Sequence, residues 1–157
     1  MEFVLMTVGK TTTPYIVKGI EEYEKRLKHY VPFSIKSLAD VRNTRKLTQE
    51  QQKEAEGRTI LSELQGGDLL VLLDERGEMP TSVEFAGMLE KWMGSGRKRV
   101  VFSVGGPYGF SKDVYARADR KLSLSRMTFS HEMVRLFFIE QIYRGMTILR
   151  GEPYHHE

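Results

Sequence analysis

A glycine-rich turn at residues 105–109 is the first place where residue type and spacing indicate chemistry. The sequence GGPYG directly follows the apolar run RVVFSV, so the turn stands at the end of an expected buried strand. Three glycines around a proline allow left-handed backbone and the close approach of a ligand. The alternative is a tight turn that only joins a strand to a helix.

The spacing of this turn does not match the common phosphate-binding motifs. Neither GxxxxGK[ST] nor GxGxxG fits the sequence GGPYG. In addition, Pro107 lacks the backbone N–H group that would donate to a phosphate at this place. We therefore expect a neutral or cationic ligand that carries an adenine or a ribose and is held by backbone groups.

Strands and helices alternate along the chain around this turn. Apolar or alternating runs predict strands at 2–9, 33–40, 68–75, 99–106 and 121–127. Helical spacing and capping residues such as Thr48, Thr81 and Ser111 predict helices at 14–30, 48–64, 81–93, 111–119 and 131–151.

This order predicts an α/β fold, in which one domain (residues 1–157) contains a parallel sheet with helices on both faces. Ligands of such sheets bind beyond the carboxyl ends of the strands. We therefore expect the turns after residues 75, 106 and 127 to surround one site.

Composition excludes several kinds of site. The chain has no cysteine, which rules out disulfides, zinc–thiolate sites and a cysteine nucleophile. His155 and His156 are adjacent, and no other histidine stands at metal-ligand spacing, so we expect no metal. Without a signal peptide or a long apolar run, the sequence predicts a soluble, cytoplasmic protein that does not bind a membrane.

Positive charge gathers in the last third of the chain. Residues 97–157 hold 11 Lys and Arg against 6 Asp and Glu, whereas the chain as a whole has a net charge of +3. Such a bias suggests a polyanionic partner, although ordinary scatter of surface charge is the alternative. The cations that we consider for contact with a nucleic-acid backbone are 97–99, Arg117, Arg120, Lys121 and Arg126.

Four segments together resemble one known family. These are GGPYGF, SLSRMTFSHEMVR, EQIYRG and PYHHE, and LLDERG (72–77) is also in place. The sequence closely resembles the RlmH family, SPOUT-class methyltransferases that use S-adenosylmethionine to methylate N3 of a pseudouridine in the 23S ribosomal RNA of assembled ribosomes. The resemblance implies a trefoil knot in the C-terminal part and a homodimer with the cofactor pocket near the dimer interface.

The resemblance also implies which residues contact S-adenosylmethionine. They lie in the three turns that the sheet order already groups, and they are Leu73, Gly105, Leu124, Ser125, Arg126, Met127, Thr128 and Phe129.

Methylation of N3 requires loss of a proton, so a general base or a cation that stabilises the resulting anion would help. The candidates are His131, Arg144, Tyr154 and His155. Each has a structural alternative: His131 caps or packs at a helix start, Arg144 pairs with Glu140 one turn earlier, and the tail frays. Tyrosine stacks on splayed-out bases in RNA readers, and an imidazole accepts protons.

Arg135 is a weaker candidate, for which the alternative is a salt bridge at the surface or in a dimer. Two other classes of protein also remain open. One is a ribosome-associated nucleotide-binding module without catalysis, and the other is a flavodoxin-like or nucleotide-binding enzyme that acts on a small molecule. The missing phosphate motifs and the basic C-terminal third argue against the latter.

Overall fold

The computed structural model describes residues 1–156, so Glu157 of the expected 1–157 domain lies outside the described residues. The described chain contains a five-stranded parallel sheet in the order β2-β1-β4-β3-β5. Its strands are β1 (Glu2–Val8), β2 (Phe33–Leu38), β3 (Leu69–Glu78), β4 (Arg99–Val104) and β5 (Arg120–Leu122). The predicted parallel sheet is confirmed.

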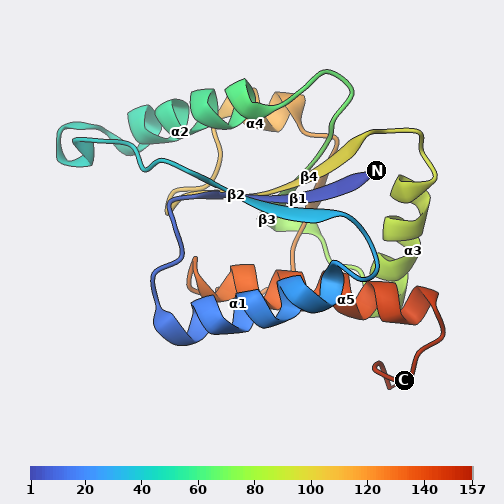
Figure 1. The fold of residues 1–157 in the computed structure, drawn as a ribbon. Helices are drawn as coiled ribbons and strands as arrows, with labels where there is room; N and C mark the ends of the chain where they lie inside the picture. Colours follow the sequence, from blue (N-terminus) through green and yellow to red (C-terminus); the bar gives the residue numbers. More distant parts are fainter. Residues whose placement is uncertain (157) are drawn as a thin grey trace.

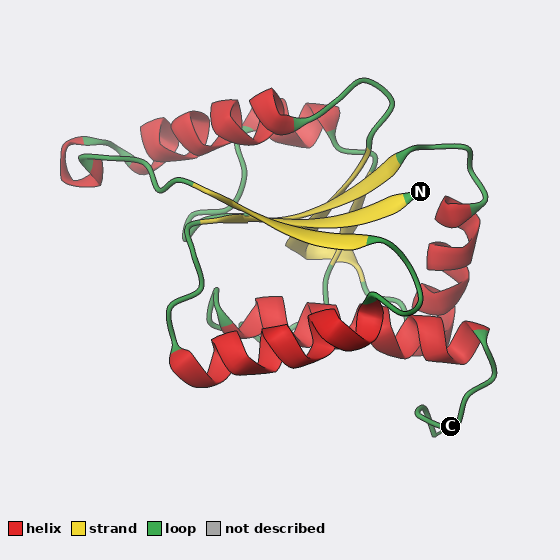
Figure 2. Ribbon diagram, in the orientation of Figure 1, coloured by secondary structure: helices red, strands yellow, loops and turns green. Residues whose placement is uncertain are grey.

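Helices cover both faces of the sheet, also as predicted (Figures 1 and 2). On one face lie α1 (Pro14–Leu27), α3 (Ser82–Met93) and α5 (Met133–Leu149), and on the other lie α2 (Gln49–Glu63) and α4 (Lys112–Arg117). A short 3-10 helix, η1 (Thr44–Lys46), precedes α2. No helix in residues 1–156 has both the length and the apolar character needed to cross a membrane.

Two apolar layers hold these elements together. Because side chains alternate across a strand, Phe3 and Leu5 of β1 face the α1, α3 and α5 layer, whereas Val4 and Met6 face α2 and α4. Burial on both faces explains the continuous apolar runs of β1, β3 and β4 in the sequence.

Local capping signals are confirmed at three helix starts. Thr48 and Gln51 form a reciprocal capping box at α2, and the hydroxyls of Thr81 and Ser111 accept backbone N–H groups of α3 and α4. These bonds fix where α4 begins, directly after the glycine-rich turn.

The fifth strand is much shorter than predicted, because β5 ends at Leu122 instead of residue 127. The chain turns there: the Ser123 N–H donates to the Glu78 carbonyl at 2.8 Å, and the Ser123 hydroxyl donates to the Ser125 carbonyl at 2.9 Å. The alternating pattern of 121–127 was therefore misleading, since Leu124 belongs to a loop.

The last helix begins later than predicted, at Met133 instead of residue 131. The Ser130 hydroxyl accepts the Met133 N–H at 3.1 Å, which ends the preceding loop. His131 consequently lies in an exposed turn before the helix.

The end of β3 lies very close to the chain around Leu122. A side chain at Gly77 would place its Cβ 2.5 Å from the Leu122 nitrogen, which leaves no space for any residue but glycine. This contact extends β3 to Glu78, beyond the predicted end at residue 75.

Candidate active site

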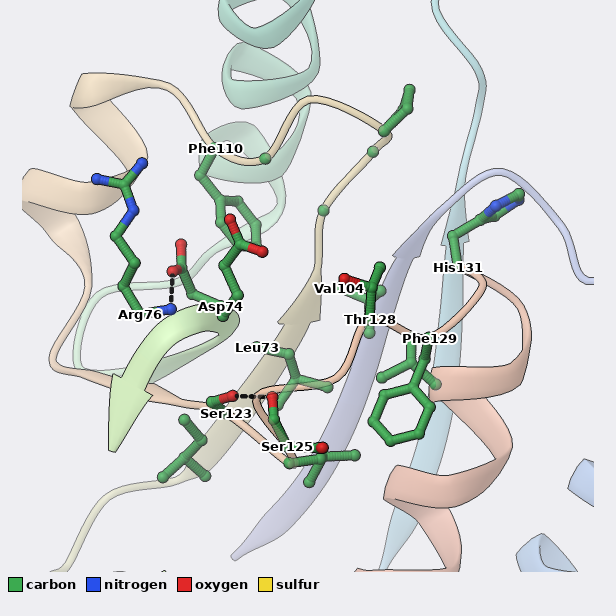
Figure 3. Close-up of a pocket in the computed structure, with 18 of the residues that line it drawn as sticks. Leu73, Asp74, Arg76, Val104, Phe110, Ser123, Ser125, Thr128, Phe129 and His131 are labelled. Atoms are coloured by element: carbon green, nitrogen blue, oxygen red, sulfur yellow. Dashed lines mark hydrogen bonds between the residues drawn. The ribbon is translucent and has the colours of Figure 1, made fainter. Parts of the chain in front are cut away.

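A cavity of about 340 Å³ opens at the carboxyl ends of β3, β4 and β5 (Figure 3). Three segments supply most of its lining, namely 73–76 after the apolar part of β3, 104–110 after β4, and residues of 122–131 after β5. The predicted convergence of three turns is confirmed, although the third turn begins after Leu122 instead of after residue 127.

This cavity is lined by most of the residues that the family resemblance assigns to cofactor binding. They are Leu73, Gly105, Leu124, Ser125, Met127, Thr128 and Phe129. Arg126 is not among the lining residues, and its side chain is exposed to solvent. His131 lines the cavity from the turn before α5, and Figure 3 shows it beside Thr128 and Phe129.

The glycine-rich turn is closely backed by other parts of the chain. A Cβ at Gly106 would lie 2.3 Å from a carboxylate oxygen of Glu56, and Gly109 has a φ of 86°. The Gly109 N–H closes the turn by donating to the Gly106 carbonyl at 3.2 Å. The glycines are therefore required by crowding at one position and by left-handed backbone at the other.

Glu56 is a carboxyl group that sequence reasoning missed. It is 5% exposed, and its Oε1 has no hydrogen-bond partner among residues 1–156, while Oε2 accepts a long bond of 3.4 Å from Gln52. Burial raises the pKa of this carboxyl. No local pattern in α2 marks Glu56, because its burial depends on the turn that packs against it.

An acidic rim on the cavity was also not predicted. Asp74 and Glu75 follow the apolar part of β3 and line the cavity. Asp74 accepts a hydrogen bond from the Tyr115 hydroxyl. It accepts a second one at 2.8 Å from the Arg76 N–H, which Figure 3 shows. Burial and this carboxylate together raise the pKa of Tyr115 to about 12, so Tyr115 remains a donor. The motif LLDERG could have indicated Asp74, because it follows a buried strand.

The remaining catalytic candidates meet in a second cluster. Arg144 lies 3.1 Å from His155 Nδ1 and donates to Glu140 at 2.7 Å, which confirms the expected pair with Glu140. Tyr154 donates to the same Glu140 oxygen at 2.8 Å, and its hydroxyl lies 3.2 Å from that of Tyr23. Burial raises the pKa of Tyr154. The tail through His155 is thus bound to α1 and α5 instead of frayed.

This cluster does not lie at the cavity of the same chain. A helix rises about 1.5 Å per residue, so Arg144 lies roughly 16 Å beyond Met133 along α5. In Figure 1 the C-terminal segment leaves α5 at the end opposite to the loop that contains His131. Of the four catalytic candidates, the chain therefore brings only His131 to the cavity.

Comparison with known proteins identifies the family of this chain. Residues 1–155 match the family described as "Predicted SPOUT methyltransferase". The chain belongs to the SPOUT methyltransferases. It is similar over its whole length, and over the whole length of each relative, to proteins named "Ribosomal RNA large subunit methyltransferase H". The identity is 57% for the protein of Parabacteroides distasonis, 55% for that of Porphyromonas gingivalis and 52% for that of Bacteroides fragilis. The resemblance to the RlmH family is confirmed.

In this SPOUT protein, Arg135 is buried, which rules out the surface salt bridge that was one structural alternative for it. Arg135 is 2% exposed and donates to the carbonyls of Val8 and Gly9 at 2.9 and 3.1 Å. Nearby, Glu132 accepts the backbone N–H groups of Thr13 and Thr12 at 3.0 Å, which lowers its pKa to about 2. These bonds join the start of α5 to the β1–α1 loop and so position the turn that carries His131.

The described part of this SPOUT chain holds no group of three or more His, Cys, Asp or Glu side chains arranged for a metal ion.

Proposed function

We propose that this protein transfers a methyl group from S-adenosylmethionine to ribosomal RNA of the large subunit. The single observation that carries the proposal is the cavity, where three turns at the carboxyl edge of a SPOUT-family sheet converge. Its volume of about 340 Å³ lies in the range of small-molecule sites. The names of the relatives supply the substrate class.

The residues at the cavity fit this cofactor. S-adenosylmethionine has a net positive charge and supplies an electrophilic methyl group on its sulfonium. Asp74 and Glu75 provide negative charge at the rim, and the turn at 105–109 offers backbone groups without a phosphate-binding motif. We assign the cofactor contacts to Leu73, Gly105, Leu124, Ser125, Arg126, Met127, Thr128 and Phe129, with Arg126 reaching in from the exposed side of its loop.

For the acceptor, we propose N3 of a pseudouridine in 23S ribosomal RNA within the assembled ribosome. His131 at the cavity, together with Arg144, Tyr154 and His155, would form the catalytic group. Arg144 supplies a cation for an anionic base, Tyr154 a stacking surface, and His155 or His131 a proton acceptor. The RlmH relationship supports this assignment.

The cavity and the C-terminal cluster lie far apart in one chain. This separation supports a homodimer in which each active site contains one cavity and one C-terminal cluster. In such a dimer, one protomer contributes the cavity and its partner contributes the cluster around His155. An apolar groove between α3 and α5, lined by Phe85, Phe129 and Phe137 among others, offers a surface that a second copy would cover. Phe137 is exposed in the single chain.

We further propose that residues 1–157 form one domain whose C-terminal part is threaded as a trefoil knot. Two observations support the threading: β5 lies beside β3 instead of β4, and Gly77 touches the backbone at Leu122. Knots are rare in proteins, and membership of the SPOUT family supports this threading here.

Methyl transfer is the decisive test. The protein is mixed with S-adenosylmethionine labelled in the methyl group and with ribosomes from cells that lack this enzyme, as intact ribosomes, free large subunits or naked RNA. Label on one pseudouridine of intact ribosomes supports the whole proposal. Cofactor binding without label on any RNA would contradict it and favour a non-catalytic binding module.

A further inference from the structure

The loop between β2 and α2 carries an exposed group of cations. Arg42, Arg45 and Lys46 are all exposed, and no acidic residue occurs between Asp40 and Glu50. We call these three residues the basic turn. In Figure 1 this loop extends away from the body of the molecule, beyond the carboxyl end of β2.

The basic turn has a defined backbone. Asn43 adopts a left-handed conformation with φ 58°, which asparagine tolerates better than most residues. The N–H groups of Lys46 and Leu47 donate to the carbonyls of Asn43 and Thr44, each at 3.1 Å. The three cations are therefore displayed on a hydrogen-bonded turn.

Within residues 1–156, none of these three cations has an ion pair or a side-chain hydrogen bond. Several arginines of the basic C-terminal third form ion pairs instead. Arg99 binds Asp68 at 2.7 Å and Arg120 binds Glu78 at 2.8 Å. Charge that is already neutralised contributes little to the attraction of a polyanion, so these paired arginines offer less to a polyanion than the basic turn does.

The basic turn also lies at the same edge of the sheet as the cavity. It follows the carboxyl end of β2, and the cavity lies at the carboxyl ends of β4 and β3. One strand, β1, separates β2 from β4, which corresponds to about 10 Å across the sheet. A nucleic acid that presents a base to the cavity would pass over this same edge.

We propose that Arg42, Arg45 and Lys46 bind the phosphate backbone of the ribosomal RNA beside the methylation site. This inference rests on the proposed function. The basic turn contacts phosphates and not bases, so it contributes affinity and orientation without reading sequence. It lies outside the cavity, so the cofactor binds independently of it.

The test compares two triple variants of the full-length protein that each remove three positive charges. One is R42Q/R45Q/K46Q. The matched control is K25Q/R58Q/K91Q, whose residues are exposed, form no ion pair within residues 1–156, and lie on α1, α2 and α3. Affinity for intact ribosomes is measured between 50 and 200 mM salt (roughly the range over which counterion release is resolved). Cofactor affinity and thermal unfolding are measured alongside.

We expect the basic-turn variant to bind intact ribosomes roughly tenfold more weakly or worse. The slope of log affinity against log salt should become shallower by about 2. The control should change much less, and cofactor affinity should change in neither. R42K/R45K should retain binding, because it keeps the charge.

Two results would overturn the inference: unchanged ribosome binding by the basic-turn variant, or equal losses in both variants. Either leaves the proposed function standing if the wild type still methylates the RNA. If the wild-type protein neither binds nor methylates intact ribosomes, the proposed function fails as well. A loss of binding confined to the basic-turn variant supports the inference even where no methyl transfer is seen.

Discussion

The carboxyl group of Glu56 lies directly behind Gly106, so close that a Cβ on this glycine would be 2.3 Å from one carboxylate oxygen. A helix on one face of the sheet thus sets the shape of the turn that lines the candidate cofactor cavity. The two residues are far apart in the sequence, so no local pattern indicates their contact.

We expect Gly106→Ala to weaken cofactor binding roughly tenfold, because Glu56 must move and overpacking of this kind costs about 1–3 kcal/mol. Calorimetric titration with S-adenosylmethionine measures the loss. The double variant G106A/E56A provides space for the new methyl group and should recover part of the affinity. If G106A alone binds normally, the turn is not backed rigidly by Glu56.

Glu56 should also make stability depend on pH. Its pKa is raised above 4.5 by burial, so the folded protein holds this proton at pH values where the unfolded chain releases it. The free energy of unfolding therefore falls as pH rises from 4.5 through the folded pKa. Glu56→Gln should remove this decline and raise the thermal midpoint at pH 8 by a few degrees, roughly 2–4 °C for each kcal/mol. Glu54→Gln, an exposed change on the same helix, should not.

Asp74→Asn should lower the affinity for S-adenosylmethionine roughly tenfold, because a carboxylate near a bound cation contributes about that much at intermediate dielectric. The affinity for S-adenosylhomocysteine, which lacks the sulfonium charge, should fall less. The ratio of the two dissociation constants is the measurement, and exposed Asp113→Asn is the control. Equal losses for both ligands would mean that Asp74 acts through its hydrogen bonds and not through its charge.

Deletion of residues 153–157 should leave cofactor binding largely intact and abolish methyl transfer, since Tyr154 and His155 lie away from the cavity of their own chain. The point variant His155→Ala separates catalysis from any loss of stability caused by the truncation. Exposed His156→Ala is its matched control and should remain active. Full transfer by the truncated protein would remove the tail from the proposed active site.

The origin of the tail at each site can be tested by mixing two inactive variants. Gly105→Val blocks the cavity, since even a Cβ there would lie 3.2 Å from the Phe110 ring, and His155→Ala disables the tail. If a symmetric dimer combines one protomer's cavity with its partner's tail, exchange of subunits should restore about a quarter of the wild-type rate. No restoration, with subunit exchange demonstrated, would contradict the shared site.

Local signals explain what the sequence by itself determined. Strand runs apolar on both faces, the Thr48 capping box and the glycine-rich turn each depend on neighbouring residues, and together they predict the parallel sheet. Because parallel strands end at one edge, the sheet order also grouped the turns around Leu73, Gly105 and Leu124 at one cavity.

The tertiary structure alone decided which polar groups are buried, which cations are paired and where the tail lies. Glu56 and Arg135 look like surface residues of helices, and both are buried by loops distant in sequence. Arg99 looks available for RNA but binds Asp68, whereas Arg42 on an unremarkable loop remains exposed. Such outcomes depend on contacts between segments far apart in the chain, and no periodicity within one segment encodes them.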